Sequence, residues 1–112
     1  MLVTWVTLSS TKDAIVEYSA VSGNSTWRAT GSEDSFQDGG SEKRMLYMHR
    51  VLLKSLQPDT QYKYHVGGLL GWSDIFWFKT RPSGTNWSPK FIVYGDMGNV
   101  DAISVPFIQV PT

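Results

Sequence analysis

Hydrophobic and polar residues alternate along most of positions 1–80, which is the pattern of β-strands with one buried face. No stretch there keeps the 3.6-residue spacing of an amphipathic helix. The segments predicted to be strands are 2–8, 14–20, 27–30, 45–53, 62–67 and 75–80. Between them, residues 31–42 are polar and contain glycine, and we expect a mobile loop there. This spacing of strands and turns favours an all-β fold, a small sandwich of two packed sheets.

The alternation stops at Phe91–Tyr94, where four apolar or aromatic residues follow one another. Such a run is typical of a strand that is buried on both faces. It leads into Gly95-Asp96-Met97-Gly98, whose glycines allow a sharp turn and place the Asp96 carboxylate at the carboxyl end of the strand. This carboxylate is a candidate metal ligand, since hard oxygen ligands suit Fe³⁺, Mn²⁺, Mg²⁺ and Zn²⁺. The alternative is an aspartate that caps a helix or shapes a turn.

The composition limits the domain count and the partners. A chain of 112 residues with 41% hydrophobic residues is enough for one globular domain and little more. Ten basic residues balance ten acidic ones, so long-range attraction favours neither nucleic acid nor an anionic membrane as a partner. No apolar stretch approaches the length of a membrane span, and the first residues do not form a signal peptide.

Cysteine is absent, which excludes disulfides, thiolate metal sites and cysteine nucleophiles. Two sequons, Asn24-Ser25-Thr26 and Asn86-Trp87-Ser88, lie in predicted loops and are candidate glycosylation sites. They indicate a secreted or extracellular parent protein whose leader is missing from this chain.

The histidines and tryptophans have structural interpretations. His49 and His65 lie in predicted strands, and His65 is expected to face away from Tyr62, Tyr64 and Val66, so we assign both histidines surface or structural roles rather than substrate or metal contact. The five tryptophans fit core and interdomain packing better than a carbohydrate or base-stacking platform.

The segment from Leu56 to Val66 reads Leu-x-Pro-x-Thr-x-Tyr-x-Tyr-x-Val. It resembles the tyrosine corner of fibronectin type III sandwiches, in which a tyrosine hydroxyl bonds to nearby backbone. Trp5 fits the buried tryptophan of the second strand of that fold. If so, the strand that normally comes first is missing, and a sheet edge is left open.

The order of sandwich, short linker and Gly-Asp-x-Gly block resembles the amino-terminal part of a purple acid phosphatase. The strand Tyr47–Leu53, the glycines 67, 68 and 71 with Trp72, and the strand Phe76–Thr80 are similar to the sandwich domain of that family. The resemblance divides the chain into a fibronectin type III-like domain at 1–80, a linker at 81–90, and the start of an α/β metallophosphoesterase domain at 91–112. The last segment would hold a first strand and a partial helix, which Asp101 or Ser104 would cap. In this chain the apolar residues of that helix would remain exposed.

The resemblance implies a hydrolase of phosphate monoesters that works at acidic pH through a dinuclear metal centre, Fe³⁺ beside zinc, manganese or ferrous iron. It assigns Asp96 as a ligand of the ferric ion. The family's Gly-Asp-x-x-Tyr, Gly-Asn-His-Glu and later histidine blocks do not occur in these 112 residues. We therefore expect a fragment of the enzyme that binds no metal stably, is inactive alone, and would pack against the rest of the catalytic domain. The alternative is a non-catalytic fibronectin-like interaction module.

Overall fold

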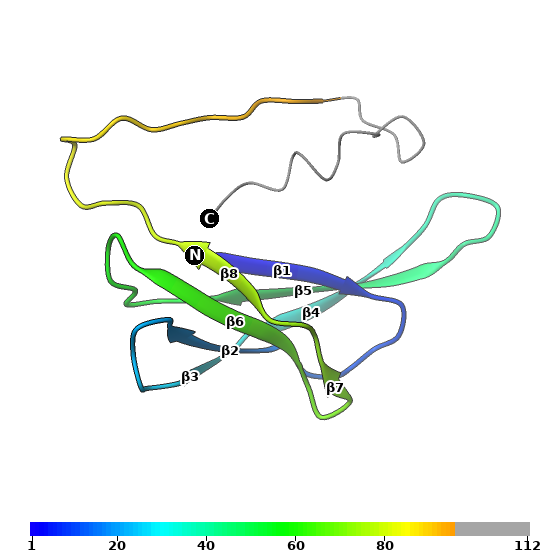
Figure 1. Ribbon diagram of the computed structural model, residues 1–112. Helices are drawn as coiled ribbons and strands as arrows, with labels where there is room; N and C mark the ends of the chain where they lie inside the picture. The colour runs from blue at the N-terminus through cyan, green and yellow to red at the C-terminus, as the bar shows by residue number, and fades with distance from the viewer. Residues whose placement is uncertain (96–112) are drawn as a thin grey trace.

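A computed structural model describes residues 1–95 of the chain, and its strands, from Leu2 to Lys79, form a sandwich of two antiparallel sheets (Figure 1). The strands are β1 (Leu2–Thr7), β2 (Ile15–Ala20), β3 (Trp27–Thr30), β4 (Ser32–Gln37), β5 (Met45–Leu52), β6 (Gln61–Gly68), β7 (Gly71–Trp72) and β8 (Phe76–Lys79). One sheet has the order β1-β5-β4. The other has the order β3-β2-β6-β7, with β8 also paired to β6. The all-β, fibronectin type III-like prediction is confirmed.

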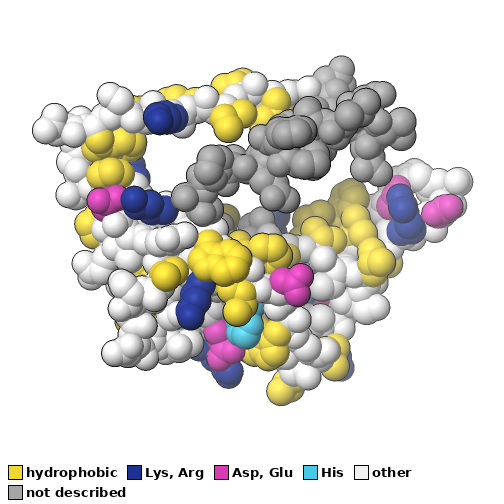
Figure 2. All heavy atoms as spheres, in the orientation of Figure 1, with side chains coloured by type: hydrophobic (Ala, Val, Ile, Leu, Met, Phe, Trp, Pro, Cys, Tyr) yellow, Lys and Arg dark blue, Asp and Glu magenta, His cyan; other side chains and the backbone are white. Residues whose placement is uncertain are grey.

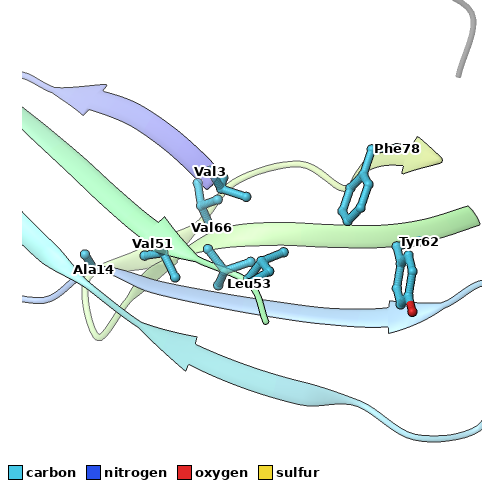
Figure 3. Packing of buried hydrophobic residues seen from close by; sticks show 8 residues of the cluster. Val3, Ala14, Val51, Leu53, Tyr62, Val66 and Phe78 are labelled. Atoms are coloured by element: carbon cyan, nitrogen blue, oxygen red, sulfur yellow. The ribbon is translucent and has the colours of Figure 1, made fainter. Parts of the chain in front are cut away.

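The core lies between the two sheets, where the inward residues of the alternating strands meet. Figure 3 shows labelled side chains from both sheets pointing into this space. The buried hydrophobic residues are Val3, Ala14, Val16, Val51, Leu53, Tyr62, Val66 and Phe78. Burying a large apolar side chain such as Val, Leu or Phe contributes about 1.5–3 kcal/mol relative to exposing it. The inward positions of the alternating pattern therefore stabilise the sandwich through the side chains that they bury.

The tyrosine corner predicted at Leu56–Val66 is present. The backbone N–H of Gln57 donates a hydrogen bond of 2.8 Å to the hydroxyl oxygen of Tyr62. The ring of Tyr62 is buried and stacks on Phe78 with 5.4 Å between ring centroids. The bond therefore ties the entry of β6 to the core at the point where the chain crosses between the sheets.

The prediction of a mobile loop at 31–42 is wrong for its first half. Residues 32–37 form β4, which pairs with β5 in a register that sets Ser32 opposite Arg50 and Gln37 opposite Met45. Its polar side chains fit this position, because β4 lies at the edge of its sheet and most of its side chains are exposed. Alternation of buried residues, on which the sequence prediction depended, is absent from such a strand.

The segment predicted as a buried strand, 91–94, has no strand structure here. Its side chains are exposed, with Phe91 at 81% and Val93 at 92%. A strand buried on both faces needs a neighbour on each side, and no strand of residues 1–90 pairs with it. Asp96, the rest of its block and the helix predicted after Asp101 lie outside the described residues. Nowhere in residues 1–95 is there a helix of the length and apolarity that crossing a membrane requires.

Candidate functional site

The metal site predicted at Asp96 cannot be built from the residues that the structure describes. Within residues 1–95, no three histidine, aspartate or glutamate side chains gather into a group that could hold a metal ion. A dinuclear centre needs several protein ligands to compete with hydration. The described donor set therefore does not fit two metal ions, and no catalytic step can be derived from it.

The most developed polar cluster in the described residues is a ladder across three strands of the larger sheet. In the sheet register Glu17 of β2 lies opposite Arg28 of β3 on one side and His65 of β6 on the other. Arg28 donates to Glu17 Oε2 at 2.9 Å, and Nε2 of His65 lies 2.9 Å from Glu17 Oε1. The hydrogen bond from His65, followed by that from Arg28, lowers the pKa of Glu17 below its ordinary value.

Trp72 of β7 covers the imidazole end of this ladder. Its ring stacks on His65 with centroids 4.3 Å apart and 16° between the planes. The guanidinium carbon of Arg28 lies 6.0 Å from the centroid of Trp72, at the limit of a cation–π contact. Figure 2 shows a histidine on the viewed face among acidic, basic and hydrophobic side chains. The stacking on Trp72 and the hydrogen bond with Glu17 together hold His65 in one orientation.

A shallow hollow of about 220 Å³ opens beside the ladder. Its lining residues are Glu17, Tyr18, Ser19, Thr26, Lys63, Tyr64, His65 and Ile75. His65 hydrogen bonds only to Glu17 among the described residues, so it has no hydroxyl to activate as a general base. The described contacts give the ladder a structural role, in which it ties three strands of the sheet surface together.

His65 was predicted to face outward, and both histidines were assigned surface or structural roles. His65 faces away from the core and is partly exposed. His49 of β5 is 0% exposed, stacks on Trp5 at 4.9 Å between centroids, and has Nε2 2.9 Å from Thr7 Oγ1. Nδ1 of His49 is buried without a partner in the described structure. Both histidines have structural contacts, and His49 is an inward residue of the sandwich.

The tryptophans were predicted to pack in the core or between domains, and Trp5 packs against the core. Trp27, Trp72 and Trp77 are exposed, whereas Trp5 and Trp87 are half-buried. The smaller aliphatic residues and Tyr62 fill the space between the sheets instead. Composition alone gave no signal for this, because it does not say which sheet face each tryptophan occupies.

Both sequon asparagines are accessible. Asn24 is exposed in the bend between β2 and β3, and Asn86 is exposed in the irregular segment after β8. Glycosylation needs an accessible asparagine in a flexible or turning backbone, so neither site is blocked by the fold.

Comparison with known proteins gives one consistent family. A model of the N-terminal domain of purple acid phosphatase matches residues 1–80. The chain is 40% identical to acid phosphatase type 7 of Mus musculus over 112 residues, which are 100% of this chain and 26% of that protein. The protein of the same name from Homo sapiens is 39% identical over 112 residues, with the same shares of 100% and 26%.

A shorter match covers 61 residues, 49% of this chain and 10% of the relative, at 38% identity to "Probable inactive purple acid phosphatase 1" of Arabidopsis thaliana. All of this chain aligns with the mouse and human relatives, but it spans only 26% of the length of each. No solved structure gives a significant match.

Proposed function

The chain belongs to the purple acid phosphatase family, and we propose that it is part of a metal-dependent enzyme that hydrolyses phosphate monoesters at acidic pH. The observation that carries the proposal is the extent of the similarity. The family model covers the sandwich at 1–80, and the 40% identity to mouse acid phosphatase type 7 continues through all 112 residues. The Gly-Asp-x-Gly block thus lies within the aligned region.

In this proposal the sandwich at 1–80 is an accessory domain, 81–90 is a linker, and 91–112 begins the catalytic domain. The exposure of Phe91, Ile92 and Val93 supports this division, because contiguous exposed apolar residues are unfavourable unless another part of the protein covers them. The rest of the catalytic domain is the partner that would cover them. Inside it, the segment gains the two neighbouring strands that a doubly buried strand requires.

Asp96 is the residue proposed to bind metal, as a ligand of Fe³⁺ in a centre whose second ion is zinc, manganese or ferrous iron. The metals would supply Lewis acidity toward the phosphate group. Since the described residues bring no further ligand group together, the 112-residue chain by itself is proposed to hold no dinuclear centre and to be inactive. Its exposed sequons at Asn24 and Asn86 fit a parent protein that is secreted and glycosylated.

A second candidate function is a non-catalytic interaction module. The similarity to a plant relative whose name includes "probable inactive" favours it. The two functions differ in the sequence expected after Asp96. An interaction module has no need for further metal ligands, whereas a phosphatase does.

The transcript that encodes this chain tests the proposal directly. We expect the sequence beyond the codon of Thr112 to contain a Gly-Asp-x-x-Tyr block and later histidine blocks. In the protein translated from it, Asp96→Asn should abolish iron binding and phosphatase activity, while Asp74→Asn, at an exposed position of the sandwich, should change neither. A stop codon directly after Thr112, or full activity of the Asp96→Asn protein, would contradict the proposal.

A further inference from the structure

The hollow beside the ladder lies on the outer face of the larger sheet, near the turn from β2 to β3. Its residues come from neighbouring strands, since Glu17 lies opposite His65 and Ser19 opposite Lys63 in the pairing of β2 with β6. Figure 2 shows hydrophobic side chains beside the histidine on this face. The volume of about 220 Å³ is below the about 300–1,000 Å³ of drug-sized ligand sites, so the hollow has room for one ring rather than for a larger ligand.

The charges around the hollow do not favour a charged ligand. Glu17 accepts a hydrogen bond from Arg28 at 2.9 Å and lies 2.9 Å from Nε2 of His65, so the ladder already pairs its acidic group. The ammonium group of Lys63 forms no ion pair within residues 1–95. An anion would meet Glu17 here, and a cation would meet Lys63 and Arg28. An uncharged ligand with several hydrogen-bonding groups fits this surface better.

The remaining lining combines apolar surface with hydroxyl groups. Ile75 lines the hollow and is 50% exposed, and Trp77, opposite Lys63 in β8, is also 50% exposed. Ser19 is 8% exposed, and within residues 1–95 neither its hydroxyl nor that of Thr26 forms a hydrogen bond. A sugar ring has the matching properties, because it carries C–H groups on its faces and polar groups around its edge.

One of the two sequons lies directly beside the hollow. Thr26 is the third residue of the sequon that begins at Asn24, and it also lines the hollow. Asn24 is exposed, and two residues of chain span at most about 7 Å, so a glycan on Asn24 would start close to the hollow. The backbone N–H of Gly23 donates a hydrogen bond of 3.0 Å to the carbonyl oxygen of Ala20, which holds this turn against the end of β2.

We propose that the N-linked glycan of Asn24 folds back onto the sheet and places one of its inner N-acetylglucosamine residues in the hollow. The apolar face of the sugar packs on Ile75 and Trp77, and its polar groups form hydrogen bonds with Ser19 and Lys63. The glycan thereby covers exposed apolar surface and stabilises the sandwich. The inference rests on the part of the proposed function in which the parent protein is secreted and glycosylated.

The second sequon supplies a matched comparison within the same chain. Asn86 is exposed as well, but it lies in the irregular segment after β8. None of the residues 84–88 lines the hollow. A glycan on Asn86 therefore has no such surface to cover, and it should leave the stability of the sandwich unchanged.

Melting temperatures of the 112-residue chain, secreted from eukaryotic cells behind an added leader, test the proposal. Asn24→Gln should lower the melting temperature by about 3 °C or more, because it removes the glycan that packs on the sheet. Asn86→Gln should change it by less than about 1 °C. The same variants made in bacteria, without these glycans, report the effect of the substitutions alone, and there we expect the two to melt together.

A second pair of variants tests whether the hollow is the site. In Ile75→Ser, the glycosylated and bacterial forms should melt within about 1 °C of each other, since the apolar contact is lost. Val21→Ser is the matched control, because Val21 is 47% exposed next to the same turn but does not line the hollow. It should keep the full stabilisation by the glycan. Circular dichroism checks that both variants remain folded, as expected for exposed side chains.

The possible failures can be told apart. A secreted chain without a glycan at Asn24 would overturn this inference together with the proposal that the parent is a glycoprotein. Equal melting temperatures with and without the Asn24 glycan would overturn this inference alone, and so would a stabilisation that survives Ile75→Ser. None of these results bears on phosphatase activity.

Discussion

The backbone N–H of Gln57 donates a hydrogen bond to the hydroxyl oxygen of Tyr62, a residue whose ring is buried between the two sheets. The bond fixes the segment before β6 against the core. The Leu56–Val66 pattern therefore has a three-dimensional basis, since the tyrosine is needed for both its ring and its hydroxyl.

Removing this hydroxyl should destabilise the sandwich. The Tyr62→Phe variant keeps the ring but leaves the N–H of Gln57 without its acceptor, which should lower the free energy of unfolding by about 1–3 kcal/mol. Urea denaturation followed by fluorescence measures the change. The control is Tyr47→Phe, because no hydrogen bond to the Tyr47 hydroxyl is found in the described structure, and it should change stability by less than about 0.5 kcal/mol. Equal stability of the two variants would contradict the tyrosine corner.

A side chain at Gly31 should disrupt the approach between β3 and β5. A Cβ atom placed there would overlap the backbone oxygen of Arg50, which is not free to move away because it belongs to a paired strand. We expect Gly31→Ala to lower the free energy of unfolding by about 1–3 kcal/mol, as overpacking does. Gly39→Ala is the matched control, since its Cβ meets no atom within 4 Å. Thermal unfolding of both variants measures the difference, and a stable Gly31→Ala protein would show that this contact is absent.

The ladder around Glu17 should make stability depend on pH in the acidic range. The pKa of Glu17 is lowered in the folded state, first by the hydrogen bond from His65 and then by that from Arg28. A carboxylate with a lowered pKa stabilises the fold above its unfolded pKa, near 4.5, and this contribution is lost as pH falls through the lower folded value.

The Glu17→Gln variant should therefore melt below the native chain at pH 7, and the gap should shrink on acidification below about pH 4.5. His65→Asn removes the first cause of the shift and should reduce the same pH dependence. Melting temperatures measured between pH 7 and pH 3 check this. A gap between native chain and Glu17→Gln that is constant over the range would contradict the role of the ladder.

Both sequons should accept glycans when the chain enters the secretory pathway. Expressed in eukaryotic cells behind an added leader, the native chain should carry N-linked glycans at Asn24 and Asn86, since both asparagines are exposed. Mass spectrometry before and after glycosidase treatment counts them. Asn24→Gln and Asn86→Gln should each remove one glycan and leave the other. A secreted chain without glycans at either position would show that the sequons are not used.

The sequence predicted the parts of this fold that depend on alternation. Val3, Val51 and Val66 face inward because their strands alternate, and the tyrosine corner followed from a local pattern. The strand β4 was missed because an edge strand with exposed side chains has no such signal, and its pairing with β5 is a tertiary effect. The contacts of His65 could not be predicted either, because they also depend on strand pairing. Alternation places His65 on the outer face but does not show that Glu17 and Trp72 are its neighbours.

The candidate metal site could also be predicted only in part from the sequence. A glycine-flanked aspartate after an apolar stretch marks Asp96 as a possible ligand, but coordination requires side chains that are distant in sequence. The apolar segment before it also shows the limit of local patterns. Phe91–Tyr94 has the composition of a doubly buried strand, yet it is exposed here, because burial depends on neighbours that residues 1–90 do not supply.

The most direct test of the central claim is a phosphatase assay on the purified 112-residue chain, with Fe³⁺ and Zn²⁺ added at acidic pH and a phosphomonoester such as para-nitrophenyl phosphate as substrate. We predict hydrolysis no faster than with the metals alone, because Asp96 lacks the partners of a dinuclear centre. Hydrolysis above that blank, lost in Asp96→Asn but kept in Asp74→Asn, would contradict the account, since it would mean that these residues assemble an active site by themselves.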